Sequence, residues 1–183
     1  MLTESEKQRY SRHIVLPEIG IKGQEKLKKA KVLVVGAGGL GSPALFYLAA
    51  AGVGTIGIVE YDSVEISNLQ RQILYRTADI GKNKADIAAD RLRELNPHIT
   101  IEVYDKKLNS NNAETIISNY DLVVDCPDNY GTRLLVSDVT KVTGIPHIYG
   151  SVSRFEGQLS VFNFKGGSTY RDLFSGLESE HTD

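Results

Sequence analysis

The sequence predicts an α/β fold built on a doubly wound, mostly parallel sheet, and three observations support that prediction. Short apolar runs alternate with stretches of helical periodicity, as they do in βαβ units. The first of these runs is rich in β-branched residues and apolar almost throughout, which is typical of parallel strands covered on both faces. The chain has 183 residues, 41% of them hydrophobic, which suits about one domain with a sizeable core.

The first half of the predicted sheet surrounds a glycine-rich segment. Strand 31–35 is apolar after its first residue and is expected to be buried on both faces. A helix is expected over 44–51, with Ser42 as its N-cap and Pro43 in the first helical position. The next apolar, β-branched run predicts a second strand over 55–59.

The remaining elements follow from the same signals. Apolar residues recur at helical spacing from 82 to 95, and Asn96 with Pro97 ends that helix. Beyond it, β-branched runs again alternate with helical patterns, and no second domain is indicated. The other expected elements are strands 99–103, 122–124, 147–150 and 159–162, a helix over 131–142, and a short helix that Asn111 or Asn112 caps and that reaches Ile117.

Composition excludes several classes of protein. The formal net charge of −2 argues against a non-specific nucleic-acid binder, which would carry a basic excess. No apolar run approaches the ~18 residues of a membrane span, and the N-terminus lacks the order of a secretory signal. A cytoplasmic protein without nucleic-acid or membrane partners is therefore expected. The single cysteine, Cys126, excludes an intramolecular disulfide.

A glycine loop directly follows the first strand and directly precedes the first helix of the sheet. Its glycines, Gly36, Gly38, Gly39 and Gly41, fit the pattern G-x-G-x-x-G in the strand-to-helix context that a Rossmann-like nucleotide site requires. Glu60 ends the second strand, where an acidic side chain can accept hydrogen bonds from a ribose. The loop alone leaves three interpretations open: a dinucleotide site, an ATP site, or merely a tight turn.

Polar residues elsewhere in the chain favour ATP. Asn68 and Arg71 follow the second strand, Lys84 opens the next helix, and Asp128 follows the fourth strand at the edge where open α/β sheets bind ligands. Arg12 precedes the sheet. Two or three cations and one carboxylate around a glycine loop suit a triphosphate with Mg²⁺, whereas a nicotinamide cofactor carries less charge.

These residues belong to longer motifs that span nearly the whole chain. The motifs are Arg9–Arg12, Gly23–Gln24, Ser67–Gln72, Gly81–Lys82 with Lys84, Asp125–Asn129 and Glu156–Gln158. With them, the sequence resembles the ubiquitin-activating-enzyme-like adenylyltransferases of the MoeB, ThiF and HesA type. The resemblance implies ATP-dependent adenylation of the C-terminal glycine carboxylate of a ubiquitin-like sulphur-carrier protein ending in Gly-Gly, as in molybdopterin or thiamine synthesis. The products would be an acyl-adenylate and pyrophosphate.

The resemblance also implies a division of the chain and a role for each site residue. Residues 1–30 would form an N-terminal helical segment, and 31–183 an ATP-binding Rossmann-like adenylation domain, C-terminally incomplete relative to the family. The glycine loop would cradle phosphate and Glu60 would hold the ribose. Asn68, Arg71 and Lys84 would hold the triphosphate, and Asp128 would ligate Mg²⁺.

The same resemblance implies a homodimer, in which Arg12 acts on the nucleotide of the partner chain. Each basic residue also has a plainer interpretation. Arg12 could be an ordinary surface residue, Lys84 a solvated lysine at a helix start, and Arg71 the partner of a nearby carboxylate. Asp128 could simply cap the helix that follows it.

The sequence departs from the family pattern at three places. Glu60 stands where aspartate is usual, and Thr169–Asp172 stands where many relatives have a first zinc-binding Cys-x-x-Cys pair. Zinc is therefore not expected, since threonine and aspartate cannot rebuild a thiolate site. The sequence reaches Asp183 before the second pair, so a fragment, a truncated product and a natural short form stay open. Two other functions also stay open: a non-catalytic nucleotide-binding relative or partner subunit, and an NAD(P)-linked oxidoreductase.

Overall fold

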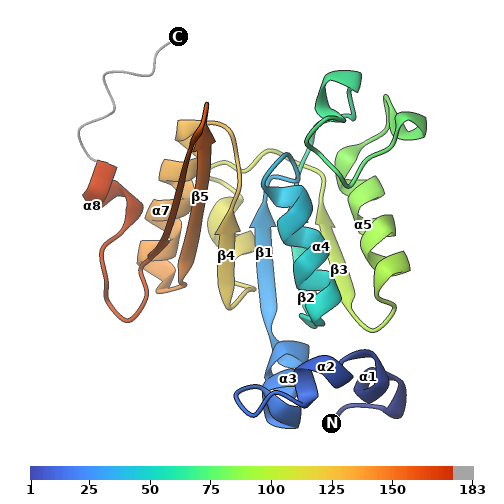
Figure 1. The fold of residues 1–183 in the computed structure, drawn as a ribbon. Helices are drawn as coiled ribbons and strands as arrows, with labels where there is room; N and C mark the ends of the chain where they lie inside the picture. The colour runs from blue at the N-terminus through green and yellow to red at the C-terminus, as the bar shows by residue number, and fades with distance from the viewer. Residues whose placement is uncertain (175–183) are drawn as a thin grey trace.

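A computed structural model describes residues 1–174 of the chain, so residues 175–183 of the unit expected over 31–183 lie outside the described part. The core is a six-stranded sheet in the order β3-β2-β1-β4-β5-β6, shown in Figure 1. All neighbouring strands are parallel except β5 and β6, which pair antiparallel. The predicted fold class is thus confirmed.

The elements have the following bounds. The strands are β1 (Lys31–Val35), β2 (Thr55–Val59), β3 (Thr100–Tyr104), β4 (Leu122–Asp125), β5 (His147–Ser153) and β6 (Glu156–Phe162). The α-helices are α1 (Glu4–Arg9), α2 (Ser11–Ile14), α3 (Gly20–Lys29), α4 (Gly41–Ala51), α5 (Lys84–Leu95), α6 (Ala113–Ile117), α7 (Tyr130–Thr143) and α8 (Tyr170–Phe174). Two 3₁₀ turns, η1 (Ile66–Asn68) and η2 (Thr77–Asp79), lie between β2 and α5.

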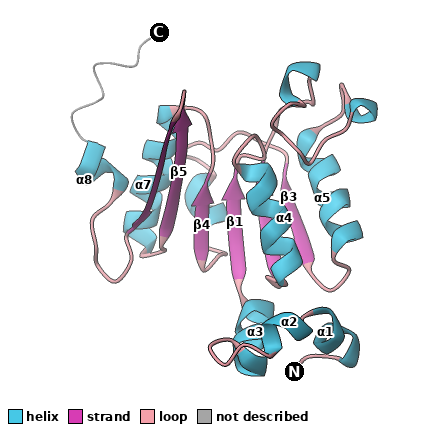
Figure 2. Ribbon diagram, in the orientation of Figure 1, coloured by secondary structure: helices cyan, strands magenta, loops and turns pink. Residues whose placement is uncertain are grey.

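The alternation of side chains along β1 explains why helices cover both faces of the sheet. Val32 and Val34 pack with apolar residues of α4 and α5, and Figure 2 shows α4 in front of the sheet. Leu33 and Val35 point to the other face and pack with residues of α6 and α7. Because helices cover both faces, the edge formed by the carboxyl ends of the parallel strands is the part of the sheet left open to a ligand.

The N-terminal helices lie at the opposite edge, below the starts of the strands in Figure 1. Buried polar contacts hold them there. The Asn96 side-chain amide donates to Tyr10 Oη and to the Ala49 carbonyl, each at 2.7 Å. The Gln24 amide donates to the Ala51 carbonyl at 2.8 Å. Residues of α1–α3 and the ends of α4 and α5 therefore pack as one layer.

The start of α4 differs from the sequence prediction. The helix begins at Gly41, and Ser42 lies inside it, where its hydroxyl donates to the Ala37 carbonyl at 3.2 Å. Ser42 is therefore not the N-cap, and Pro43 is not the first helical residue. The helix can begin at residue 41 because glycine has no Cβ. A Cβ at this position would lie only 2.0 Å from the Gly36 carbonyl oxygen.

Thr169 and Asp172 form reciprocal hydrogen bonds at the start of α8. The Thr169 N–H donates to Asp172 Oδ2 at 2.8 Å, and the Asp172 N–H donates to the Thr169 hydroxyl at 3.3 Å. This is the pattern of a helix-capping box. No helix among residues 1–174 is long and apolar enough to cross a membrane.

Candidate active site

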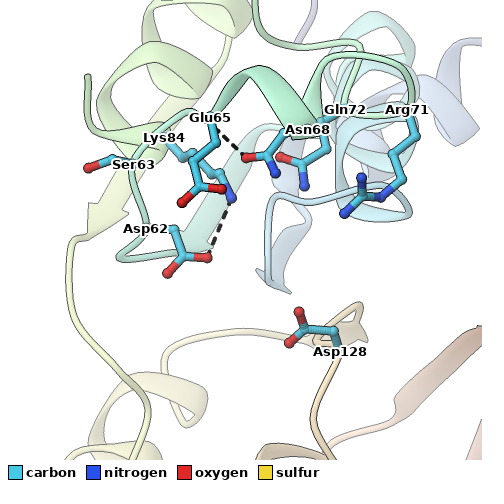
Figure 3. A pocket seen from close by; sticks show the side chains of 8 residues that line it. All are labelled: Asp62, Ser63, Glu65, Asn68, Arg71, Gln72, Lys84 and Asp128. Atoms are coloured by element: carbon cyan, nitrogen blue, oxygen red, sulfur yellow. Dashed lines mark hydrogen bonds and ion pairs between the residues drawn. The ribbon is translucent and has the colours of Figure 1, made fainter. Parts of the chain in front are cut away.

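A cleft of about 1070 Å³ lies at the carboxyl edge of the parallel strands. It includes the glycine loop after β1 and the segment after β4. These two neighbouring strands are where the strand order reverses, the usual ligand position in open α/β sheets. A smaller cavity of about 200 Å³ lies beside it, and its lining side chains are drawn in Figure 3. The residues lining the small cavity are Asp62, Ser63, Glu65, Asn68, Arg71, Gln72, Lys84 and Asp128.

The start of the glycine loop is fixed by a close approach that only glycine permits. Gly36 has a φ of +88°, and a Cβ there would meet the Cys126 carbonyl oxygen at 2.9 Å. Gly38 and Gly39 line the cleft. Gly39 lies under the Arg71 side chain, whose Cδ would be 3.4 Å from a Cβ on Gly39. The loop can therefore bring backbone N–H groups close to a phosphate.

Glu60 is 7% exposed and ties the glycine loop to β2. Its Oε2 accepts the Ala37 N–H at 3.0 Å. Its Oε1 accepts the N–H groups of Tyr61 and Asp62 at 2.8 and 2.9 Å. The carboxylate also lines the cleft. Glu60 therefore holds the loop in place, a role that the sequence interpretation did not assign to it.

Lys84 is buried, with 5% exposure, at the first residue of α5. Its Nζ lies 3.4 Å from Oδ2 of Asp62, a carboxylate whose side chain is 55% exposed. Figure 3 shows the ammonium group pointing into the small cavity. The alternative of a solvated lysine is therefore wrong. A buried cation needs an anionic partner, and this one faces a space that an anion can enter.

Arg71 reaches the same cavity from the turn after η1. Its Nη1 donates to the Ser67 carbonyl at 3.2 Å and to Gln70 Oε1 at 3.3 Å. Among residues 1–174, no ion pair joins Arg71 to a carboxylate, so the alternative of a local acidic partner is wrong. Asn68 stabilises this turn, because its Oδ1 accepts the Glu65 N–H at 3.2 Å.

Asp128 faces Lys84 and Arg71 across the small cavity (Figure 3). The residue that caps α7 is Asn129, whose Oδ1 accepts the Thr132 N–H at 2.9 Å. The alternative in which Asp128 caps the helix is therefore wrong. Its exposed carboxylate is free to bind a ligand.

The charges of the small cavity are mixed. Three carboxylates and two cations line it. Burial raises the pKa of Tyr61, and the charges of Asp62, Glu60 and Asp128 raise it further. A polyanion would therefore meet both attraction and repulsion, and a divalent cation bound with it would relieve the repulsion. Within the described residues, no group of three or more His, Cys, Asp or Glu side chains could hold a metal alone.

Sequence reasoning missed Gln72 as a site residue, although it ends the quoted motif Ser67–Gln72. Its side chain is 4% exposed and lines the cavity. Its Oε1 is buried without a hydrogen-bond partner among the described residues, an unusual state for a buried amide oxygen. Its burial depends on tertiary packing that the sequence does not reveal.

Two other residues, Arg12 and Cys126, do not line the small cavity. Arg12 is exposed on α2, at the opposite edge of the sheet, and does not line the cleft of its own chain. Cys126 follows β4, where burial and, to a smaller extent, the nearby Asp125 raise the pKa of its thiol to about 12. A thiol that stays protonated at neutral pH is a poor nucleophile, as expected for a packed residue.

The comparisons with known proteins agree with this geometry. The model of the ThiF family matches residues 10–183. A "Probable molybdopterin-synthase adenylyltransferase" of Porphyra purpurea is 51% identical over 94% of this chain and 45% of its own length. A "Sulfur carrier protein adenylyltransferase" of Thermus thermophilus is 50% identical over 94% of this chain and 65% of its own. The chain thus spans less than two thirds of the length of these relatives.

A solved structure is similar as well. The Escherichia coli tRNA N6-threonylcarbamoyladenosine dehydratase TcdA, crystallised in complex with ATP, superimposes with a TM-score of 0.76 and 29% identity. The match covers 80% of this chain and 60% of that one.

Proposed function

The chain belongs to the ThiF family, and on that premise we propose that it adenylates the C-terminal glycine carboxylate of a ubiquitin-like sulphur-carrier protein with ATP. One observation carries the proposal. Arg71, Lys84 and Asp128 come from three separate segments, and their side chains line one cavity beside the glycine loop. A reaction that moves charge among phosphates needs this kind of convergence. The unit from residue 31 onward would be the adenylation domain.

The residues suggest where each part of ATP binds. The loop N–H groups at Gly38 and Gly39 suit a phosphate, and Glu60 keeps one lone pair on Oε2 for a ribose hydroxyl. Asn68, Arg71 and Lys84 suit the triphosphate. The donor set fits Mg²⁺, which is bound through one or two carboxylates plus substrate phosphates; Asp128 would hold the ion, and the ion would neutralise phosphate charge.

The proposed reaction is a displacement at phosphorus. A carboxylate oxygen of the carrier forms a bond to the α-phosphorus of ATP. The bond from that phosphorus to the bridging oxygen breaks, and its electrons leave with pyrophosphate. No general base is needed, because an α-carboxyl of pKa ~3.3–3.7 is already ionised at neutral pH. Arg71 and Lys84 contribute by positioning the phosphates and stabilising their growing charge.

We also propose a homodimer and a cytoplasmic location. Arg12 supports the first, since its exposed guanidinium lies too far around the molecule to serve its own cleft and is open to a second copy. The cytoplasmic location is supported by the need for ATP. The carrier would end in Gly-Gly and belong to molybdopterin, thiamine or a similar sulphur-transfer chemistry. The names of two relatives, a molybdopterin-synthase adenylyltransferase and a sulphur carrier protein adenylyltransferase, support the molybdopterin and sulphur-carrier part.

The test is exchange of labelled pyrophosphate into ATP. We expect exchange that requires Mg²⁺ and a carrier ending in Gly-Gly, and none with the same carrier lacking its last two glycines. Asp128→Ala and Lys84→Ala should each lower the rate by about 10²–10³-fold. Exchange that is unaffected by Asp128→Ala would overturn the role of that residue. ATP binding without carrier-dependent pyrophosphate release would instead favour a non-catalytic relative.

A further inference from the structure

Arg133 of α7 is a buried cation that does not line the small cavity. Its side chain is 8% exposed, and it donates hydrogen bonds to two main-chain carbonyls from different elements. Nη2 donates to the Pro127 carbonyl at 2.6 Å, and Nη1 donates to the Gly150 carbonyl at 2.9 Å. Arg133 thus joins the segment after β4 to the middle of β5.

The guanidinium cannot easily turn away from these carbonyls. Its Nη1 lies 3.6 Å from Oδ2 of Asp125, a fully buried carboxylate that also contacts His147 Nε2 at 3.1 Å. The guanidinium carbon lies 4.8 Å from the centre of the Tyr149 ring. A planar cation held by a charge, a ring face and two acceptors has one favoured orientation.

The position of Asp128 depends on this arrangement. Pro127 immediately precedes it, and Asn129 immediately follows it and is fixed as the cap of α7. Among residues 1–174, Asp128 itself makes no hydrogen bond or ion pair. The position of its carboxylate therefore depends on the backbone of Pro127 and Asn129. Arg133 holds the Pro127 side through its hydrogen bond to the Pro127 carbonyl.

We propose that Arg133 is a positioning residue for Asp128, holding the Pro127 carbonyl so that the carboxylate faces the small cavity in the geometry that Mg²⁺ requires. This inference rests on the proposed function for the identity of the metal. It predicts that Arg133 variants weaken the metal-dependent part of nucleotide binding while leaving the metal-independent part intact.

The first experiment needs no ligand. Hydrogen exchange of amides 128–132 is measured in the full chain for the wild type, Arg133→Lys and Arg133→Gln. A single ammonium group cannot reach two carbonyls as a guanidinium can, so both variants should exchange faster in this segment, with the amides of β1 and β2 unchanged. Wild-type exchange at 128–132 in both variants would overturn the proposal. Arg93→Lys, on the exposed side of α5, is the matched control.

The second experiment measures ATP affinity as a function of Mg²⁺ concentration. We expect Arg133→Lys and Arg133→Gln to raise the Mg²⁺ concentration at half-maximal affinity by about ten- to a hundredfold, with ATP affinity in EDTA unchanged. An equal loss with and without Mg²⁺ would mean a merely structural role and would overturn the proposal. A wild type that binds no ATP would refute the proposed function, while the exchange measurement would still decide whether Arg133 positions Asp128.

Discussion

Glu60→Gln tests how the glycine loop is held. The carboxylate accepts three backbone N–H groups, two at Oε1 and one at Oε2. Glutamine keeps the length of the side chain but replaces one acceptor oxygen with a donor NH₂ group. In the less costly orientation, the carbonyl oxygen faces Tyr61 and Asp62, and the NH₂ group faces the Ala37 N–H.

The expected cost follows from that orientation. Ala37 is fully buried, so its N–H is left without an acceptor at about 1–3 kcal/mol. The two remaining hydrogen bonds lose their charge, which removes roughly 1 kcal/mol more. We therefore expect Glu60→Gln to lower the free energy of unfolding by about 2–4 kcal/mol, and each kcal/mol to lower Tm by about 2–4 °C in a domain of this size.

The assay is urea and thermal unfolding of wild type, Glu60→Gln and Glu114→Gln. Glu114 is exposed on α6, so its variant makes the same chemical change without the buried contacts and should stay within about 0.5 kcal/mol of wild type. If Glu60→Gln were as stable as Glu114→Gln, the three hydrogen bonds would not hold the loop and the reasoning would fail.

Three further predictions concern other sites. Gly41→Ala should disrupt the start of α4, since its Cβ would lie 2.0 Å from the Gly36 carbonyl; circular dichroism melts should show a loss above about 2 kcal/mol, and wild-type stability would contradict it. Cys126, whose burial raises its thiol pKa to about 12, should react with iodoacetamide at pH 8 far more slowly in the folded than in the urea-unfolded protein; equal rates would refute this. Burial alone would raise the pKa of Glu6, but hydrogen bonds from Lys28 and Thr3 lower it from 4.5 to about 2. The stability that Glu6 contributes is therefore complete above about pH 4.5 and lost as pH falls towards 2. In urea unfolding, Glu6→Gln should lower the free energy of unfolding by about 1–3 kcal/mol at pH 7 and by progressively less below pH 4.5. A difference between the two proteins that does not change with pH would count against this prediction.

Local signals in the sequence were enough to predict much of the fold. The strand at 31–35, the glycines after it and the helix stop at Asn96 depend on neighbouring residues, and the structure has β1, the loop and the end of α5 at those positions. The N-cap at Ser42 was wrong because the choice depended on a contact five residues away. The absent Cβ of Gly41 lets the helix begin against the Gly36 carbonyl.

Less of the candidate site could be predicted from the sequence. Motifs placed Arg71, Lys84 and Asp128 at one edge of the sheet, and the structure brings their side chains to one cavity. What the motifs could not reveal was burial. The second role of Glu60, the unpartnered oxygen of Gln72 and the bridging hydrogen bonds of Arg133 all arise where segments far apart in sequence meet.

The central claim is that this cleft binds a metal-bridged triphosphate rather than a nicotinamide dinucleotide. Calorimetric titration of the full chain with Mg·ATP and, separately, with NADH tests it most directly. We expect saturable binding of Mg·ATP that weakens strongly in Lys84→Ala, and no binding of NADH at the same concentrations. Tight binding of NADH with none of ATP would contradict it.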